Sequence, residues 1–223
     1  MSYRYERKSL ISSLQYFELI HFLKKSPNIF TVLYPKRIVN NIYFDTMNMS
    51  SFSDAVEGST KRVKIRIRWY GDLYGEINNP VLEIKIKKGS VGTKEHYPLK
   101  SFIFSGKTTN KYIKNFLKNS HLPPKILELV KQVSPVLVNR YERDYFQDCD
   151  NQFRITIDKD VRFYNISSFG IKNVAGHIDH LILELKYGVE SENRANEIFN
   201  KFPFRLTKSS KFTNGLDLIN SFI

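Results

Sequence analysis

Arg62-Val63-Lys64-Ile65-Arg66-Ile67-Arg68-Trp69 is the stretch that decides the fold, because its even positions are all cationic and its odd positions are all apolar. Alternate residues of a β-strand point to opposite faces of the sheet, so this period of two predicts a strand with one charged and one apolar face. A solvated strand face normally mixes charges of both signs, since like charges on neighbouring positions repel one another. Four cations without an acid among them therefore point to an anionic partner.

The same alternation recurs along the chain. Together with Val39–Asp45, the strands predicted are Tyr3–Lys8, Lys61–Trp69, Val81–Lys87, Lys94–Leu99, Val138–Phe146, Phe153–Phe163, Leu181–Tyr187 and Arg205–Phe212. Apolar residues at helical spacing, with Pro at the ends, predict helices at Leu10–Lys25, Asn48–Val56, Lys111–Leu117, Pro124–Val133 and Glu190–Phe202. The segment Asn165–His180 has neither pattern and is predicted to be a mobile loop. No point along this series is an obvious boundary, so residues 1–223 are predicted to form a single domain.

Composition narrows the class of protein. The chain has 223 residues, 35 Lys and Arg against 22 Asp and Glu, and a net charge of +13. A hydrophobic content of 41% is enough for a core and excludes general disorder. One cysteine, Cys149, excludes an internal disulfide framework and a Cys-rich zinc site. No apolar run approaches the ~18 residues of a spanning helix, and no signal core follows the N-terminus. We therefore expect a cytoplasmic protein that binds nucleic acid, an anionic membrane or a small polyanion.

Three arrangements of the strands satisfy the alternation. The strands could close into a barrel, with helices outside and the cations lining a polyanion-binding tunnel. They could form an open sheet that binds nucleic acid, or an ordinary sheet with one solvated face. Nucleic acid is disfavoured, because single-strand binders interleave cations with exposed aromatic rings and Trp69 lies on the apolar side. Glu6, Glu83 and Glu184, which lie among the cations, suit a divalent metal that bridges phosphate oxygens better than a direct phosphate contact.

Eight segments in order along the chain carry a resemblance to a known family. They are RYERK (Arg4–Lys8), YFDT (Tyr43–Thr46), KIRIRWYG (Lys64–Gly71), LEIKIK (Leu82–Lys87), YERDYF (Tyr141–Phe146), FRITIDKD (Phe153–Asp160), ILELKY (Ile182–Tyr187) and KSSKFTNG (Lys208–Gly215). By these segments the chain resembles the VTC domain, the polyphosphate polymerase domain of the triphosphate tunnel metalloenzyme or CYTH-like superfamily. The resemblance implies an α+β fold: an eight-stranded antiparallel β-barrel, the tunnel, with helices packed outside it.

The resemblance also implies the residues of the site. The phosphate-contacting, catalytic residues are expected to be Lys8, Arg66, Arg68, Lys85, Arg143 and Arg154. Further substrate contacts are expected from Lys64, Lys87, Tyr141, Lys186, Lys208, Ser210 and Lys211. Glu184 matches the family's metal-binding glutamate for Mn²⁺ or Mg²⁺. Glu6 and Glu83 are added as metal ligands from the strand alternation and from the frequent use of glutamates in the superfamily.

The activity implied is that of a polyphosphate polymerase-type phosphotransferase, which moves the γ-phosphate of a nucleoside triphosphate onto a phosphate or polyphosphate chain. Two alternatives stay open: a metal-dependent inorganic triphosphatase, and a module that binds polyphosphate without turnover. Other superfamily members open with Glu-x-Glu-x-Lys, whereas Arg4 stands here at the first glutamate position, which favours the polymerase branch. The expected partners are a nucleoside triphosphate, inorganic triphosphate or polyphosphate, with no nucleic acid; a membrane role would need a separate membrane partner.

Overall fold

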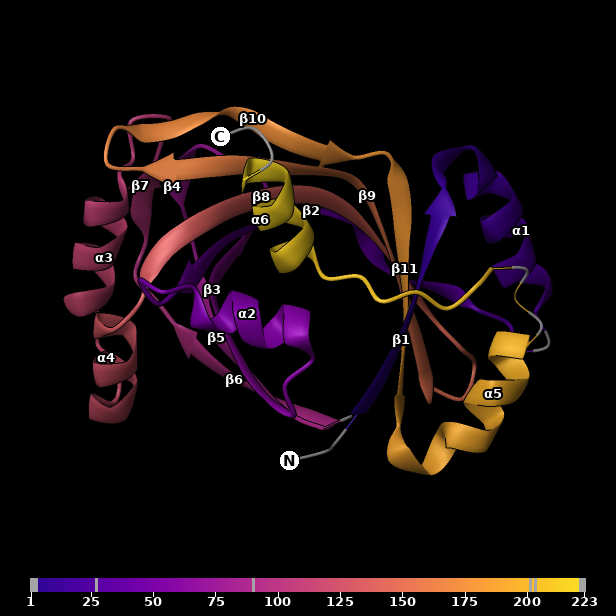
Figure 1. The fold of residues 1–223 in the computed structure, drawn as a ribbon. Helices are drawn as coiled ribbons and strands as arrows, with labels where there is room; N and C mark the ends of the chain where they lie inside the picture. Colours follow the sequence, from indigo (N-terminus) through magenta and orange to yellow (C-terminus); the bar gives the residue numbers. More distant parts are fainter. Residues whose placement is uncertain (1–3, 27, 90, 201, 203, 221–223) are drawn as a thin grey trace.

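A nine-stranded antiparallel sheet is the centre of the computed structural model, which describes residues 4–26, 28–89, 91–200, 202 and 204–220. The strands are β1 (Arg4–Ser12), β2 (Thr31–Asp45), β3 (Lys61–Tyr70), β5 (Val81–Lys88), β6 (Val91–Pro98), β8 (Ser134–Gln147), β9 (Phe153–Ser167), β10 (Gly170–Ile178) and β11 (His180–Gly188). They lie in the order β10-β9-β11-β1-β6-β5-β3-β2-β8 (Figure 1). Two short strands, β4 (Gly75–Ile77) and β7 (Phe102–Phe104), pair separately. The predicted α+β class is confirmed.

The sheet is strongly curved (Figure 1), and its strand order decides how far the barrel prediction is met. β9 pairs with β8 as well as with β10 and β11, so a strand near one end of the order meets the strand at the other end. The link between β1 and β6, in contrast, consists of one residue pair among the described residues, Arg4 with Gly92. A curved antiparallel sheet is therefore established, whereas closure into an eight-stranded barrel stays a prediction.

Helices cover the apolar face of the sheet on two sides (Figure 1). On one side, α3 (Asn110–Lys118) and α4 (Pro124–Lys131) pack against β3 and β5, where Ile67 and Ile84 are buried. On the other side, α1 (Tyr16–Lys25) and α5 (Glu192–Asn200) pack against β9 and β11, where Leu183 is fully buried. The apolar positions of the alternating strands thus form the core, which is the outcome their period predicted.

One helix lies on the opposite, charged side of the sheet. In α6 (Lys211–Asn220), Phe212, Leu216 and Ile219 are buried in a cluster that includes Tyr43 and Tyr141 of the sheet. The predicted strand Arg205–Phe212 is therefore wrong: residues 205–210 have no regular structure, and the helix begins at residue 211. The reason is the spacing of these three apolar residues, which is helical and which the local period of two in the preceding segment obscured.

Two further boundaries differ from the sequence prediction. The predicted helix at residues 10–25 starts later, because β1 continues to Ser12 by pairing with β11, and a short 3-10 helix (Ser13–Gln15) precedes α1. The predicted mobile loop at residues 165–180 is largely a hairpin, in which β9 turns into β10 at Gly170 with a positive φ of 112°. Register shifts within β10 break its alternation, which is why the sequence pattern did not indicate a strand. Tyr3 and Lys201, at the edges of predicted elements, lie outside the described residues.

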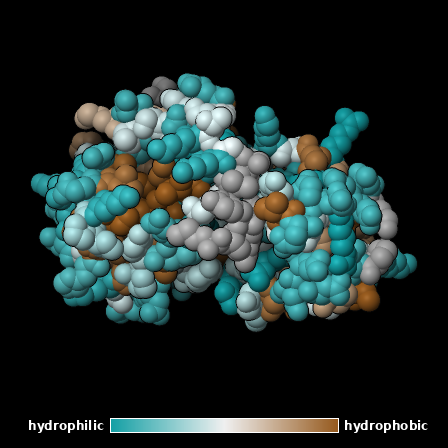
Figure 2. Space-filling model, turned by 90° about the horizontal axis from the view of Figure 1, so that it is seen from below, coloured by the Kyte–Doolittle hydropathy of each residue, from teal (hydrophilic) through white to brown (hydrophobic). Residues whose placement is uncertain are grey.

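The remaining helix, α2 (Ser50–Glu57), borders a part of the core that is not fully covered. A cavity of about 230 Å³ lies between α2, β3 and α4, and its lining includes Val63 and Leu129, which pack on the core from its margin. Seen from below (Figure 2), the surface is mostly hydrophilic, with a hydrophobic area on the side of α3 and α4. Among the described helices, none combines the length and the apolar character that a bilayer span requires.

Candidate functional site

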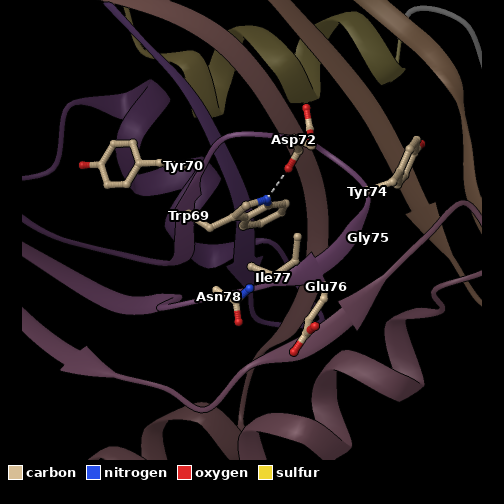
Figure 3. Close-up of a pocket in the computed structure, with 8 residues that line it drawn as sticks. All are labelled: Trp69, Tyr70, Asp72, Tyr74, Gly75, Glu76, Ile77 and Asn78. Carbon is tan, nitrogen blue, oxygen red and sulfur yellow. Dashed lines mark hydrogen bonds between the residues drawn. The ribbon is translucent and has the colours of Figure 1, made fainter. Parts of the chain in front are cut away.

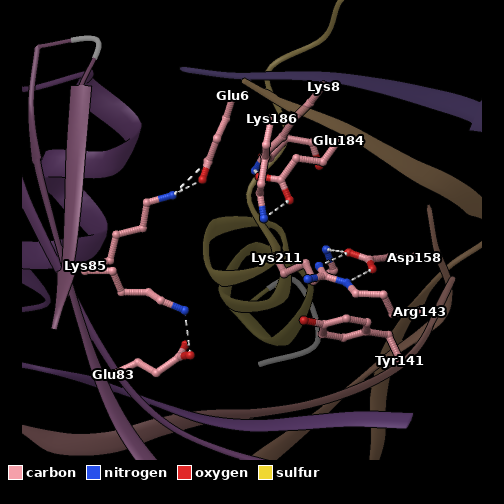
Figure 4. A network of polar contacts seen from close by, with 12 residues as sticks. Glu6, Lys8, Glu83, Lys85, Tyr141, Arg143, Asp158, Glu184, Lys186 and Lys211 are labelled. Atoms are coloured by element: carbon pink, nitrogen blue, oxygen red, sulfur yellow. Dashed lines mark hydrogen bonds and ion pairs between the residues drawn. The ribbon is translucent and has the colours of Figure 1, made fainter. Parts of the chain in front are cut away.

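The alternating strands bring their polar residues to a common face of the curved sheet. We call this the charged face and define it by Glu6, Lys8, Arg62, Lys64, Arg66, Arg68, Glu83, Lys85, Lys87, Lys94, Tyr141, Arg143, Arg154, Asp158, Glu184 and Lys186, which share one side of the strand register. Figure 4 shows members of this face pointing toward a shared space from several strands, with α6 beside them. Cations outnumber the carboxylates, so the shared space has a positive potential that favours an anionic ligand.

Asp158 binds two cations beside the shared space, Arg143 and Lys211. Its carboxylate is fully buried and accepts hydrogen bonds from Arg143 Nε at 2.5 Å and Arg143 Nη2 at 2.7 Å, while Lys211 at the start of α6 forms an ion pair with the same group (Figure 4). Burial alone would raise the pKa of Asp158, but Arg143 and Lys211 lower it to about 2. The acid therefore stays ionised and holds both cations in place.

Glu83 supports a second group of cations. Arg66 Nη2 lies 2.6 Å from Glu83 Oε2, and Lys94 Nζ lies 2.7 Å from Oε1. Arg68 is 3.6 Å from the same carboxylate and also donates to Asn41 Oδ1 at 2.9 Å. Burial alone would raise the pKa of Glu83, yet the two arginines lower it well below its ordinary value. Arg66 and Arg68 are consequently fixed on neighbouring inward positions of β3, where a phosphate could meet both guanidinium groups.

Glu184 differs from the other acids because its ion pairs with neighbouring lysines are long. Its carboxylate is 9% exposed, and Lys186 at 3.5 Å and Lys8 at 3.9 Å are its ion-pair partners, both longer than a hydrogen bond. Burial opposes ionisation, but Lys186, Lys8 and Arg143 lower the pKa of Glu184 well below its ordinary value. A buried, ionised carboxylate with loosely held partners has oxygen lone pairs left for a hard cation.

These residues can be tested against a divalent metal. Glu6 lies diagonally across from Glu184, since Glu6 pairs with Lys186 and Lys8 with Glu184 in the register of β1 and β11. Glu6 holds a single cation, since both of its oxygens bond Lys85 Nζ at 2.7 Å and 2.8 Å, whereas Glu83 holds Arg66 and Lys94 on separate oxygens, so Glu83 suits a metal least. No group of three or more His, Cys, Asp or Glu within the described ranges could hold a metal. Glu184 therefore has the freest carboxylate of the three, and an ion held by it, with Glu6 once Lys85 is released, would need its other oxygen ligands from a bound phosphate chain.

Lys64 connects the charged face to the segment before α6. Its Nζ donates to Ser210 Oγ at 2.9 Å and lies 5.3 Å from the centre of the Phe212 ring. Burial, followed by the repulsion of Lys8 and Lys85, lowers the pKa of Lys64 to about 7. The pKa of Lys64 therefore lies far closer to neutral pH than that of an ordinary lysine, and an anion bound nearby would favour the protonated ammonium.

The segment before α6 also reaches β1. Lys8 Nζ donates to the Ser209 carbonyl at 2.9 Å, and the backbone N–H of Leu10 donates to Thr207 Oγ1 at 3.0 Å. Lys208, between these two anchors, is exposed and has no hydrogen bond or ion pair to any residue that the structure describes. Of the three C-terminal residues predicted for the site, Lys211 and Ser210 thus contact the charged face, whereas Lys208 forms no polar contact with its described residues.

Three predicted residues of the site remain to be located: Tyr141, Lys87 and Arg154. Tyr141 is buried beneath Arg143 and Lys211, whose charged groups lie 5.2 Å and 4.6 Å from its ring centre. Although burial would raise the pKa of Tyr141, Arg143 and Arg68 lower it to about 8. Lys87 pairs with Arg62 in the register, and Arg154 pairs with Lys186, so both lie at the margins of the charged face.

Sequence reasoning missed several residues of this arrangement. Asp158, Lys94 and Asn41 were not singled out, although Asp158 has the alternation of Arg154 and Lys94 lies opposite Lys85. The alternating positions of Asp158 and Lys94 indicate that both belong to the charged face. Their interaction partners could not be predicted in the same way, because these partners come from distant parts of the chain.

A cavity of about 350 Å³ lies outside the charged face, at the end of β3 (Figure 3). Its lining includes Trp69, whose Nε1 donates to the Asp72 carbonyl at 2.9 Å, and the carboxylate residue Glu76. The side chains of Tyr70 and Trp69 point to opposite sides of β3 (Figure 3). With acids rather than cations in its lining, this cavity does not suit a phosphate chain.

Solved structures share the fold of the chain. A candidate adenylate cyclase from Vibrio parahaemolyticus aligns with a TM-score of 0.55 and 12% identity over 97% of this chain and 98% of its own. The PH1819 protein from Pyrococcus horikoshii gives 0.54 and 14% over 96% and 99%. A candidate adenylate cyclase from Bacillus halodurans gives 0.52 and 15% over 94% and 96%. At these identities the likeness concerns the fold alone.

The sequence profile of the VTC domain matches residues 3–220, nearly the whole chain. The chain therefore belongs to the VTC domain family, which confirms the resemblance drawn from its strand motifs. No curated protein matches the chain.

Proposed function

We propose that this chain is a polyphosphate polymerase-type phosphotransferase. The γ-phosphate of a nucleoside triphosphate would pass to a terminal oxygen of a phosphate or polyphosphate chain: the bond from the γ-phosphorus to the bridging oxygen breaks, a new phosphoanhydride forms, and the nucleoside diphosphate leaves. The observation that best supports this proposal is that buried carboxylates hold Arg66, Arg68 and Arg143 in fixed positions around the shared space of the charged face.

The arginines would grip the phosphate chain in this proposal. Two parallel N–H donors match two phosphate oxygens, so Arg66, Arg68 and Arg143 are suited to fix the geometry of the transferred group. Phosphoryl transfer depends mainly on positioning and on neutralisation of charge, which these preorganised groups supply without rearrangement. Lys85, Lys87 and Lys186 act as point charges that accommodate a chain at several registers.

Glu184, assisted by Glu6, would hold Mn²⁺ or Mg²⁺ in the same space. When bound, such an ion polarises phosphate oxygens and neutralises the charge that develops on the leaving group. Glu6 would have to give up Lys85 for this, and the released ammonium would then be available to the substrate. The partners proposed are a nucleoside triphosphate, inorganic triphosphate or polyphosphate, and delivery of product to a membrane would need a separate protein.

Incubation with ATP and Mn²⁺, followed by gel detection of polyphosphate, tests the proposal. We expect polymer from the wild type and from Arg162→Ala, since the Arg162 side chain is 45% exposed and pairs with Asp160 away from the charged face. Arg66→Ala and Glu184→Gln should lose at least about tenfold in polymer yield, the loss typical of one charge-assisted contact to a phosphoryl group. Release of phosphate without polymer would indicate a triphosphatase, and wild-type yield from both variants would refute the assigned site.

A further inference from the structure

Arg37 lies in β2 within a cluster of tyrosine rings. Its guanidinium carbon is 4.8 Å from the ring centre of Tyr34, 5.5 Å from that of Tyr70 and 5.6 Å from that of Tyr145. Tyr34 and Tyr145 meet edge to face, with ring centres 5.6 Å apart. We call these four residues the tyrosine cluster. Its members come from β2, β3 and β8, so it is built by the sheet and not by one loop.

The tyrosine cluster continues the charged face at one end. Arg37 is the register partner of Arg143, and Val39, two residues further along β2, pairs with Tyr141 on one side and Tyr70 on the other. The guanidinium of Arg143 lies 6.0 Å from the centre of the Tyr145 ring. A ligand whose phosphates lie on Arg68 and Arg143 would therefore extend directly over the cluster if it left the charged face on this side.

Arg37 has no acidic partner in the part of the chain that the structure describes. Within the ranges that the structure describes it forms no hydrogen bond and no ion pair, and three tyrosine rings lie 4.8–5.6 Å from its guanidinium carbon. The adjacent Lys36, in contrast, pairs with Glu142 at 3.0 Å. On the rest of the charged face the arginines Arg66 and Arg143 are held by buried carboxylates. A cation left with its donors free, on the margin of a phosphate site, is available to a ligand.

The rings of the cluster are partly open to solvent. Tyr70 is 51% exposed and Tyr34 is 39% exposed, so neither ring is packed fully into the core. Burial raises the pKa of Tyr145 to about 12, so its hydroxyl stays neutral and does not repel a phosphate. Flat π faces beside an unpaired guanidinium are the pattern that binds a nucleobase by stacking.

We propose that the tyrosine cluster is the nucleobase site of the donor nucleotide, with the base stacked against Tyr70, Tyr34 and Arg37 while its phosphates lie on Arg68 and Arg143. This rests on the proposed function, because it assumes that a nucleoside triphosphate is the donor. Stacking tolerates any base, since every base has a π face. The site therefore favours nucleotides over inorganic triphosphate but discriminates little among ATP, GTP and CTP.

Titration calorimetry with β,γ-imido-ATP and with inorganic triphosphate, both in the presence of Mn²⁺, separates base from phosphate contacts. We expect Tyr70→Leu and Tyr34→Leu each to weaken the nucleotide analogue at least about fivefold, the lower range for loss of a base–aromatic stack. Their affinity for inorganic triphosphate should stay within about twofold of the wild type, since the phosphate contacts are untouched. Tyr112→Leu is the matched control, because Tyr112 is 43% exposed on α3 and remote from the charged face.

Two results would overturn the base site. One is nucleotide binding that both leucine variants retain at wild-type strength; the other is an equal loss for nucleotide and inorganic triphosphate, which would show that the cluster supports the phosphates or the fold. Using two variants keeps the test decisive if one of them does not fold. A wild type that binds the nucleotide through the cluster but makes no polymer would refute the transfer activity alone, whereas a wild type that binds neither ligand would refute both.

Discussion

Asp158 holds the guanidinium of Arg143 with both carboxylate oxygens, at 2.5 Å and 2.7 Å, and no part of Asp158 is exposed to solvent. The two residues are register partners on β9 and β8, so the sheet itself aligns them. Such a pair keeps Arg143 pointing into the shared space before any ligand arrives. The free-energy cost of burying this charge is thus compensated during folding, and the ligand binds a cation that is already in position.

Asp158→Asn should destabilise the protein strongly. The substitution leaves Arg143 and Lys211 buried without their common counter-charge, a change that costs about 3–5 kcal/mol in comparable buried pairs. Urea denaturation of the wild type and the variant measures this difference in the free energy of unfolding.

Asp150→Asn is the control for that measurement. Asp150 pairs with Arg194 at 2.6 Å, but both side chains are largely exposed, so the variant should unfold at the wild-type urea concentration. Equal midpoints for all three proteins would contradict the supporting role of Asp158.

Acid should destabilise the protein in a pH range that depends on the pKa of Asp158. Its pKa is about 2 in the folded state and 3.8 in the absence of partners, so its stabilising contribution is complete above 3.8 and is lost as the pH falls toward 2. The wild type should lose about 2 kcal/mol more than Asp158→Asn between pH 4 and pH 2. Parallel stability curves for the two proteins, followed by circular dichroism, would exclude this linkage.

Much of the charged face could be predicted from sequence because alternation is a local property. Arg66, Arg68, Lys85 and Glu184 lie on one face as their period of two requires. Alternation does not say which residues meet across strands. The contact of Arg143 with Asp158 depends on the β8–β9 register, and that of Lys211 depends on where α6 packs, so neither leaves a short-range signal.

Other parts of the structure were hidden for different reasons. The helical spacing of Phe212, Leu216 and Ile219 becomes clear only over the full length of α6, so a window ending at Phe212 resembled a strand. The tyrosine cluster was not predicted, because register shifts between Tyr34 and Arg37 break the alternation of β2. Irregular pairing of this kind is decided by the neighbouring strand.

Lys64→Met should stabilise the fold while it weakens ligand binding. Burial beside Lys8 and Lys85 lowers the pKa of Lys64 from 10.5 to about 7, so the unfolded chain binds this proton more readily than the native protein does. The resulting penalty grows as the pH falls from about 10.5 to 7 and is constant below that range. Thermal unfolding should therefore give the variant a higher melting temperature at pH 7.

The advantage of Lys64→Met should vanish near pH 11, where Lys64 is neutral in both states. Affinity for inorganic triphosphate should change in the opposite direction, falling in the variant because one ammonium has been removed from the charged face. A variant that is less stable than the wild type at pH 7 would show that the contact with Ser210 outweighs the repulsion.

Titration calorimetry of inorganic triphosphate against wild type, Arg66→Ala and Arg162→Ala tests the central claim most directly, namely that the charged face is the phosphate site. Wild type and Arg162→Ala should bind with equal affinity that falls as salt is added, whereas Arg66→Ala should bind at least about tenfold more weakly while remaining folded. Absence of binding by the wild type, or equal affinity of Arg66→Ala and the wild type, would contradict the claim.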